Sequence, residues 1–156
     1  MSPEAIKPEL ELLFEARAAL GPPVTVGETP QGPRRVVPIT GGTFAGPAMR
    51  GEILPGGADW QYDRADGATV LDARYLLRTN DHVVLEVTNH GLRHGPSHVL
   101  RRVAAGEDVD PASYYFRASP AFSAPKGRYE WLNRSLFLCT GARSASAVTL
   151  WFFRVL

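Results

Sequence analysis

The chain has 156 residues, with 17 basic and 16 acidic side chains and a formal net charge of +1. This length suits a single domain over residues 1–156, and such a domain buries roughly 70% of the surface of its unfolded chain. The balanced charge, with no like-charged block longer than two arginines, argues against a nucleic-acid partner. The single cysteine, Cys139, excludes an intrachain disulfide and a cysteine-based metal cluster.

Residues 1–7 contain Pro and Glu, whereas a secretory signal needs a basic segment followed by an apolar stretch. The longest apolar stretch, residues 148–153, is far too short for a membrane-spanning helix. We therefore expect a cytoplasmic protein with no membrane partner. An outer-membrane barrel would require export, which this N-terminus does not support.

The first predicted strand covers residues 10–20. Apolar side chains recur there at every second position, namely Leu10, Leu12, Phe14, Ala16, Ala18 and Leu20. A period of two places them on one face of a strand. A helix is the alternative, because Glu, Leu, Ala and Arg are good helix formers, but the alternation is cleaner than any 3.6-residue pattern.

Nine further segments rich in strand-forming residues are bounded by Gly, Pro, Asn or Asp: 24–28, 34–40, 48–54, 70–78, 83–89, 97–103, 114–118, 128–140 and 147–155. Only residues 109–113 favour a short helical turn, with Asp110 as cap and Pro111 in the first turn. Ten short strands favour an all-β fold, a closed or nearly closed antiparallel β-barrel, because closure leaves no open edges. Barrels of about eight strands can hold one small ligand.

Six short motifs follow one another along the chain: Gly27–Pro30, Gly41–Pro47, Gly56–Gln61, Asp72–Tyr75, Tyr114–Arg117 and Trp131–Asn133. In this order, over roughly residues 10 to 156, they resemble the DUF3237 (UPF0311) family of small proteins. The resemblance implies a β-barrel fold and a site region, but the biochemical role of the family is unassigned. His82 departs from the family pattern, which often has Gly there in a tight turn.

Three residues are candidate catalytic groups. Asp59 lies beside Trp60, and packing against an apolar ring can raise a carboxyl pKa and make it a general acid or base. The alternative is an Asp that caps its own turn.

The second catalytic candidate is Arg74. It shares a strand face with other charged residues and either faces solvent or binds an oxyanion in the cavity. The resemblance favours the second, because the arginine belongs to a recurring Ala-Arg-Tyr piece.

The third catalytic candidate is Tyr115, which lies on the same side of its strand as Arg117. A phenol near an arginine can donate a proton to a developing oxyanion. An equally simple interpretation is a tyrosine at the barrel rim with Arg117 stacked on it.

Arg117 and five further residues are candidates for substrate binding. Thr43 and Phe44 follow paired glycines that leave room for a ligand, although such glycines also bend sheets at barrel corners. The predicted strand over residues 128–140 would place Trp131 and Asn133 on one face, where aromatic and neutral polar groups are typical of a small-molecule site. An ordinary core face is the alternative. Trp60 would complete the wall of the predicted binding cavity.

No Gly-x-Ser-x-Gly elbow, phosphate loop, dinucleotide fingerprint or His-Glu-x-x-His motif occurs. The four histidines show no ligand-like spacing, and Gly95-Pro96 argues against the helix that His94 and His98 would need. We therefore expect no metal and no cofactor.

Three functions are compatible with these residues. The first is a cofactor-free isomerase, lyase or cyclase acting by proton transfer on a small oxygenated metabolite, with Asp59 as acid or base and Arg74 and Tyr115 holding the oxyanion. The second is a non-catalytic ligand-binding barrel of the lipocalin kind. The third is a structural or interaction module, for example a homodimer joined through strand edges.

Overall fold

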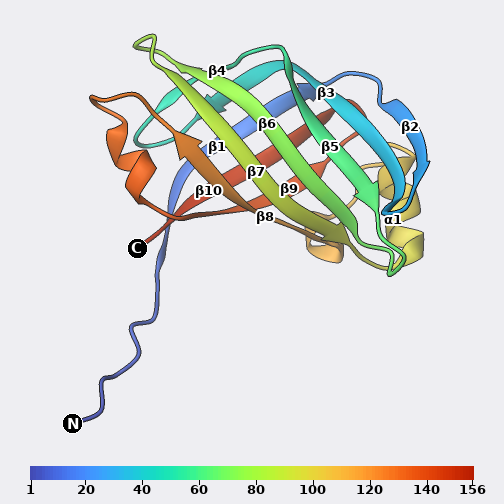
Figure 1. Cartoon of the computed structure of the whole chain (residues 1–156), viewed down its shortest axis with the longest axis horizontal. Helices are drawn as coiled ribbons and strands as arrows, with labels where there is room; N and C mark the ends of the chain where they lie inside the picture. The colour runs from blue at the N-terminus through green and yellow to red at the C-terminus, as the bar shows by residue number, and fades with distance from the viewer.

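The computed structural model describes all 156 residues and folds ten strands into one antiparallel sheet that closes into a barrel (Figure 1). The strands are β1 (Leu10–Leu20), β2 (Val24–Thr29), β3 (Gly32–Ala45), β4 (Arg50–Ile53), β5 (Gly57–Asp63), β6 (Thr69–Thr79), β7 (Val84–His94), β8 (Tyr115–Ser123), β9 (Phe137–Arg143) and β10 (Ala147–Val155). The prediction of a closed antiparallel β-barrel is confirmed.

The barrel closes because β1 pairs with both β10 and β3. The short strands β4 and β5 occupy one place between them, since both pair with β3 on one side and β6 on the other. Strand β2 follows β1 along the same edge of β3. The ten strands therefore fill eight positions around the barrel, a number that leaves space for one small ligand.

The single apolar face predicted for residues 10–20 is wrong at its start. Leu10 and Leu12 are exposed, whereas Leu13 and Phe14 are both buried. The pairing of β1 with β10 shifts register between Leu12 and Phe14, and such a bulge inserts one extra residue and exchanges the faces.

Residues 97–103 were predicted as a strand but form the helix α1 (Ser97–Ala104). Val99 and Val103, four residues apart, are its buried side chains, which is the spacing of one helix face. The predicted turn at residues 109–113 is present as the 3-10 turn η1 (Pro111–Ser113). Its cap is Asp110, whose side chain accepts from the Ala112 N–H at 2.9 Å. No helix in the chain has the length and apolarity needed to cross a membrane.

The predicted strand over residues 128–140 is wrong in its first half. A 3-10 turn, η2 (Glu130–Arg134), occupies that half, and β9 begins only at Phe137. Asn133 holds the turn in place, because its side chain accepts from the backbone N–H of Ala124 and donates to the backbone oxygen of the same residue.

The two ends of the barrel interior differ in chemistry. One end is filled by a phenylalanine cluster, Phe14, Phe44, Phe122, Phe137 and Phe152, in which Phe14 and Phe152 stack with ring centroids 4.5 Å apart. Leu132 of η2 is buried in the same core. Helix α1 lies at the other end of the barrel (Figure 1). The packed rings close one end, so a ligand site inside the barrel must lie toward α1.

Candidate functional site

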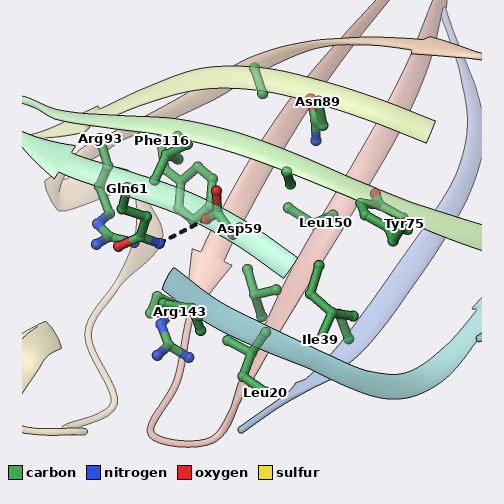
Figure 2. Close-up of a pocket in the computed structure, with 16 residues that line it drawn as sticks. Leu20, Ile39, Asp59, Gln61, Tyr75, Asn89, Arg93, Phe116, Arg143 and Leu150 are labelled. Carbon is green, nitrogen blue, oxygen red and sulfur yellow. Dashed lines mark hydrogen bonds between the residues drawn. The ribbon is translucent and has the colours of Figure 1, made fainter. Parts of the chain in front are cut away.

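A narrow cavity of about 50 Å³ lies inside the barrel between the phenylalanine cluster and α1. Its polar lining comes from inward-facing positions on neighbouring strands: Asp59 and Gln61 of β5, Tyr75 of β6, and Asn89 and Arg93 of β7 (Figure 2). Most of the remaining wall is apolar, with Ala18, Leu20, Val37, Ile39, Leu71, Ala73, Phe116, Ala118, Val148 and Leu150, and Arg143 completes it. Apolar walls with a few polar groups are typical of small-molecule sites.

The cavity continues into a wider hollow of about 700 Å³ beside α1, here named the mouth. The two spaces share Gln61, Arg93 and Arg143 in their walls. Charged side chains around the mouth are predominantly basic, since Arg35, Arg93, Arg101 and Arg143 face a single carboxylate, Asp63. A positive entrance attracts anionic or electron-rich ligands.

The Asp59 carboxylate is held in a fixed orientation. Gln61 Nε2 donates to Asp59 Oδ2 at 2.7 Å, and the Asp72 backbone N–H donates to Oδ1 at 2.9 Å. Gln61 is oriented in turn by Arg35, whose Nε donates to Gln61 Oε1 at 2.9 Å and whose Nη1 lies 2.8 Å from Asp63. Because Gln61 is itself held by Arg35, its hydrogen bond fixes the orientation of the Asp59 side chain.

Burial raises the pKa of Asp59 above its ordinary value. The hydrogen bonds from Gln61 and Asp72 and the positive charge of Arg93 lower it, but they offset the burial only in part. A carboxyl group shifted toward neutrality exchanges protons more readily near physiological pH, which suits a general acid or base.

Two arginines face the same cavity without a carboxylate partner. Arg93 forms no ion pair, and Arg143 donates only to the backbone oxygens of Ser144 and Ala147. Burial lowers the pKa of both groups, yet a guanidinium stays charged at neutral pH. The site therefore combines a partly buried carboxyl group with two cations that can stabilise negative charge on a bound oxygen.

Of the nine residues predicted as site residues, only Asp59 lines the cavity. The inward orientation expected for Arg74 is wrong. Its side chain is 67% exposed and lies 2.7 Å from Glu86 on the outer face. Side chains alternate along a strand, so the inward position of Tyr75 sends Arg74 outward.

Tyr115 and Arg117 also lie outside the barrel, because Phe116 between them points inward. Tyr115 stacks on His94 with centroids 4.7 Å apart, and the Arg117 guanidinium lies 5.4 Å from the tyrosine ring centre. This is the rim arrangement that the sequence left as the alternative.

The predicted wall residues do not meet at the cavity. Thr43 and Trp60 are exposed on the outer face, and Phe44 is buried in the phenylalanine cluster. Trp131 lies under the Arg154 guanidinium at 4.9 Å, and Asn133 bonds the backbone of Ala124. None of these five residues lines the cavity.

Sequence reasoning missed Gln61, Tyr75, Asn89, Arg93 and Arg143. Residues 57–63 were not predicted as a strand but form β5, and the alternation along β5 places both Asp59 and Gln61 inward. Arg93 and Arg143 lay beyond the predicted ends of their strands, at residues 89 and 140. No group of three or more His, Cys, Asp or Glu side chains is placed to hold a metal ion.

The fold and the site define a small closed β-barrel whose internal cavity has mainly apolar walls and a few polar groups. Residues 8–155 match the model of a family described as a protein of unknown function (DUF3237). The chain belongs to this family.

A UPF0311 protein of Rhodopseudomonas palustris is 38% identical over 95% of this chain and 97% of its own length. A crystal structure of a conserved protein of unknown function from that bacterium superposes with a TM-score of 0.92 and 38% identity, covering 97% of this chain and all of that one. A beta-barrel like protein of Acinetobacter baumannii gives a TM-score of 0.87 at 36% identity over 99% of this chain and all of the other. A hydroalkoxylation enzyme of Penicillium herquei is 35% identical over 52% of this chain and 54% of its own.

Proposed function

We propose that the protein is an enzyme that transfers a proton on a small oxygenated organic molecule bound in the mouth and reaching into the barrel cavity. The observation that carries the proposal is Asp59, a partly buried carboxyl group fixed by two hydrogen bonds and facing a cavity that also contains Arg93 and Arg143. Asp59 acts as the general acid or base, and the two arginines stabilise negative charge on the substrate oxygen.

The partial similarity to the Penicillium hydroalkoxylation enzyme supports one reaction class. In a hydroalkoxylation, an O–H bond breaks, a C–O bond forms across a carbon–carbon double bond, and the proton ends on the neighbouring carbon. Asp59 takes the hydroxyl proton and returns it to carbon, so the reaction needs no net oxidant or reductant. When both groups belong to one molecule, the product is a cyclic ether and an isomer of the substrate.

When the double bond is conjugated with a carbonyl group, negative charge moves during this reaction from the attacking oxygen to the carbonyl oxygen. Arg93 and Arg143 lie where the cavity meets the mouth, and neither is neutralised by a carboxylate of the protein. In a narrow, largely apolar cavity, fixed cations stabilise such charge more strongly than water does. The arginines therefore favour an electron-poor double bond as the acceptor.

The test uses 2'-hydroxychalcones, in which a phenol adds to a neighbouring enone. Cyclisation is followed by absorbance and by ¹H NMR in D₂O, which also detects deuterium delivered to carbon. We expect the protein to accelerate the cyclisation and Asp59→Asn to lower the rate by about 100-fold or more, as loss of a general acid or base does.

The matched control is Glu52→Gln, which removes the same charge from a side chain on the outer face that is 55% exposed and pairs with Arg78. This variant should keep its rate within about twofold, the ordinary effect of a surface change. A ligand-binding barrel without catalysis would bind these compounds and leave their spontaneous cyclisation unchanged. Equal rates for the unaltered protein and Asp59→Asn would overturn the proposal.

A further inference from the structure

Two buried polar side chains at the deep end of the cavity have hydrogen-bonding capacity that no group of the protein uses. Tyr75 is 4% exposed and Asn89 is 5% exposed, and both line the cavity. The Tyr75 hydroxyl and Asn89 Oδ1 are without a hydrogen-bond partner. Because nearly all buried polar atoms in folded proteins are hydrogen-bonded, the pair requires an explanation.

The two side chains are placed to share one ligand atom. Asn89 on β7 pairs with Ala73 on β6, two residues before Tyr75, so both point inward as diagonal neighbours. Diagonal positions of a sheet are roughly 7–8 Å apart, within reach of long side chains. Figure 2 shows Tyr75 and Asn89 on the far side of the cavity from Gln61 and Arg93, with Asp59 between the two groups.

The chemistry of the two free atoms selects one kind of ligand group. Burial above all raises the pKa of Tyr75 well above its ordinary value, so its hydroxyl keeps its proton and can donate. Asn89 Oδ1 can only accept. A carbonyl oxygen would satisfy Tyr75 alone, and a cation would satisfy Asn89 alone. A neutral hydroxyl group satisfies both, because its oxygen accepts from Tyr75 and its hydrogen is donated to Asn89.

Replacing a buried polar group that has no partner in the protein by an apolar group of the same shape is often neutral or stabilising.

We propose that Tyr75 and Asn89 form a subsite for a hydroxyl group of the substrate, so the protein acts on phenols or alcohols that enter with this hydroxyl first. This hydroxyl is separate from the oxygen on which Asp59 acts nearer the mouth. The identity of the bound molecule as a substrate rests on the proposed function, whereas the recognition of its hydroxyl group does not.

The first experiment compares phenol with toluene, two molecules of nearly the same shape that differ by a hydroxyl and a methyl group. Affinities come from titrations followed by amide ¹H–¹⁵N NMR of the full chain. We expect phenol to bind about tenfold more tightly, although hydrophobicity alone would favour toluene. Tyr75→Phe and Asn89→Leu should each remove most of this preference and leave toluene affinity within about twofold. Equal affinities, or no saturable shift at cavity residues with either probe, would overturn the proposal.

The second experiment measures the stability of the free variants. Tyr75→Phe should leave the denaturant midpoint unchanged or raise it, because the hydroxyl has no partner to lose. Tyr129→Phe is the control, since Tyr129 is as deeply buried and its hydroxyl donates to Asp81 at 2.7 Å. It should lower the midpoint and keep the phenol preference. A midpoint lowered equally by both variants would show that the Tyr75 hydroxyl is bonded within the protein, against the proposal.

Asp59→Asn distinguishes this proposal from the proposed function. The subsite predicts that this variant keeps the tenfold preference for phenol even when cyclisation stops. Absence of the preference with intact, Asp59-dependent cyclisation would overturn the subsite alone. A clear preference in a protein that accelerates no cyclisation would support the subsite and overturn the catalytic role of Asp59.

Discussion

Gln61 donates a hydrogen bond from Nε2 to Asp59 Oδ2 at 2.7 Å, from two positions further along the same strand. The orientation of its amide is fixed by Arg35, which can only donate and therefore takes the amide oxygen. Gln61 consequently always offers a donor to Asp59. This hydrogen bond favours the ionised carboxylate and lowers the pKa of Asp59. Burial raises that pKa by more, so the net shift is upward.

Replacing Asp59 by Asn should change how stability depends on pH. The pKa of Asp59 is higher in the folded than in the unfolded protein, so its contribution is fully present below the unfolded pKa and is lost as pH rises through the folded pKa. We expect the free energy of unfolding of the unaltered protein, relative to Asp59→Asn, to fall as pH rises from about 4, the unfolded pKa of an Asp, through the raised pKa of the folded protein. Urea denaturation at several pH values measures this difference. A difference that rises with pH would contradict the burial of the carboxyl group.

Replacing Arg93 by Met should raise the pKa of Asp59, because the positive charge of Arg93 stabilises the carboxylate. The measurement is a ¹³C NMR titration of the Asp59 carboxyl carbon. Arg74→Met is the matched control, since it removes an equal charge from the outer face, where Arg74 pairs with Glu86. The titration of Asp59 in this control should coincide with that of the unaltered protein. A shift of the same size in both variants would mean that Arg93 acts only through net charge.

Replacing Gly42 by Ala should destabilise the barrel strongly. Gly42 has a φ of +140°, and a Cβ there would collide with the backbone oxygen of Arg17 on β1. We expect a loss of about 3 kcal/mol or more in the free energy of unfolding. Gly41→Ala is the control, because its φ is +150° but the nearest atom to an added Cβ is 3.7 Å away. This control should cost only about 1 kcal/mol. Equal losses would show that backbone conformation, and not the contact with β1, determines the cost.

Replacing His82 by Gly should stabilise the protein by about 1 kcal/mol. His82 is the one residue other than glycine with a positive φ, 67°, and it lies in the tight turn between β6 and β7. The turn therefore forms despite the departure from the family pattern, with His82 in a conformation that glycine adopts more easily. Asn80→Gly in the same turn should lower stability instead, because Asn80 has no positive φ to relieve. Thermal denaturation of both variants gives the comparison.

The sequence predicted the barrel well because alternation and turn residues are local signals. It predicted the site poorly because alternation shows which residues share a face but not which face lies inside. In β6 the pattern separates Arg74 from Tyr75, yet only the closure of β1 on β3 and β10 decides that Tyr75 faces the cavity. The resemblance to the DUF3237 family favoured Arg74 as the inward residue, whereas Tyr75 is the one that lines the cavity. A conserved motif can reflect the inward tyrosine as readily as its charged neighbour.

The helix α1 and the turn η2 were missed for a related reason. Both lie at the ends of the barrel, where tertiary contacts override a pattern that looks like a strand. Asn133 illustrates this, since its two bonds to Ala124 fix a turn that no local preference indicates. Arg93 and Arg143 were missed because the predicted strands ended too early, and element boundaries are determined by partners elsewhere in the sheet.

The phenylalanine cluster has a kinetic consequence for any molecule that uses the cavity. With one end filled by stacked rings, entry and exit take place through the same opening beside α1. A molecule longer than the cavity is wide cannot turn round inside, so the end that enters first leaves last. The arginines of the mouth therefore determine the orientation of the molecule before it reaches Tyr75 and Asn89. A product must also clear the opening before the next substrate can enter, which makes release a natural limit on turnover.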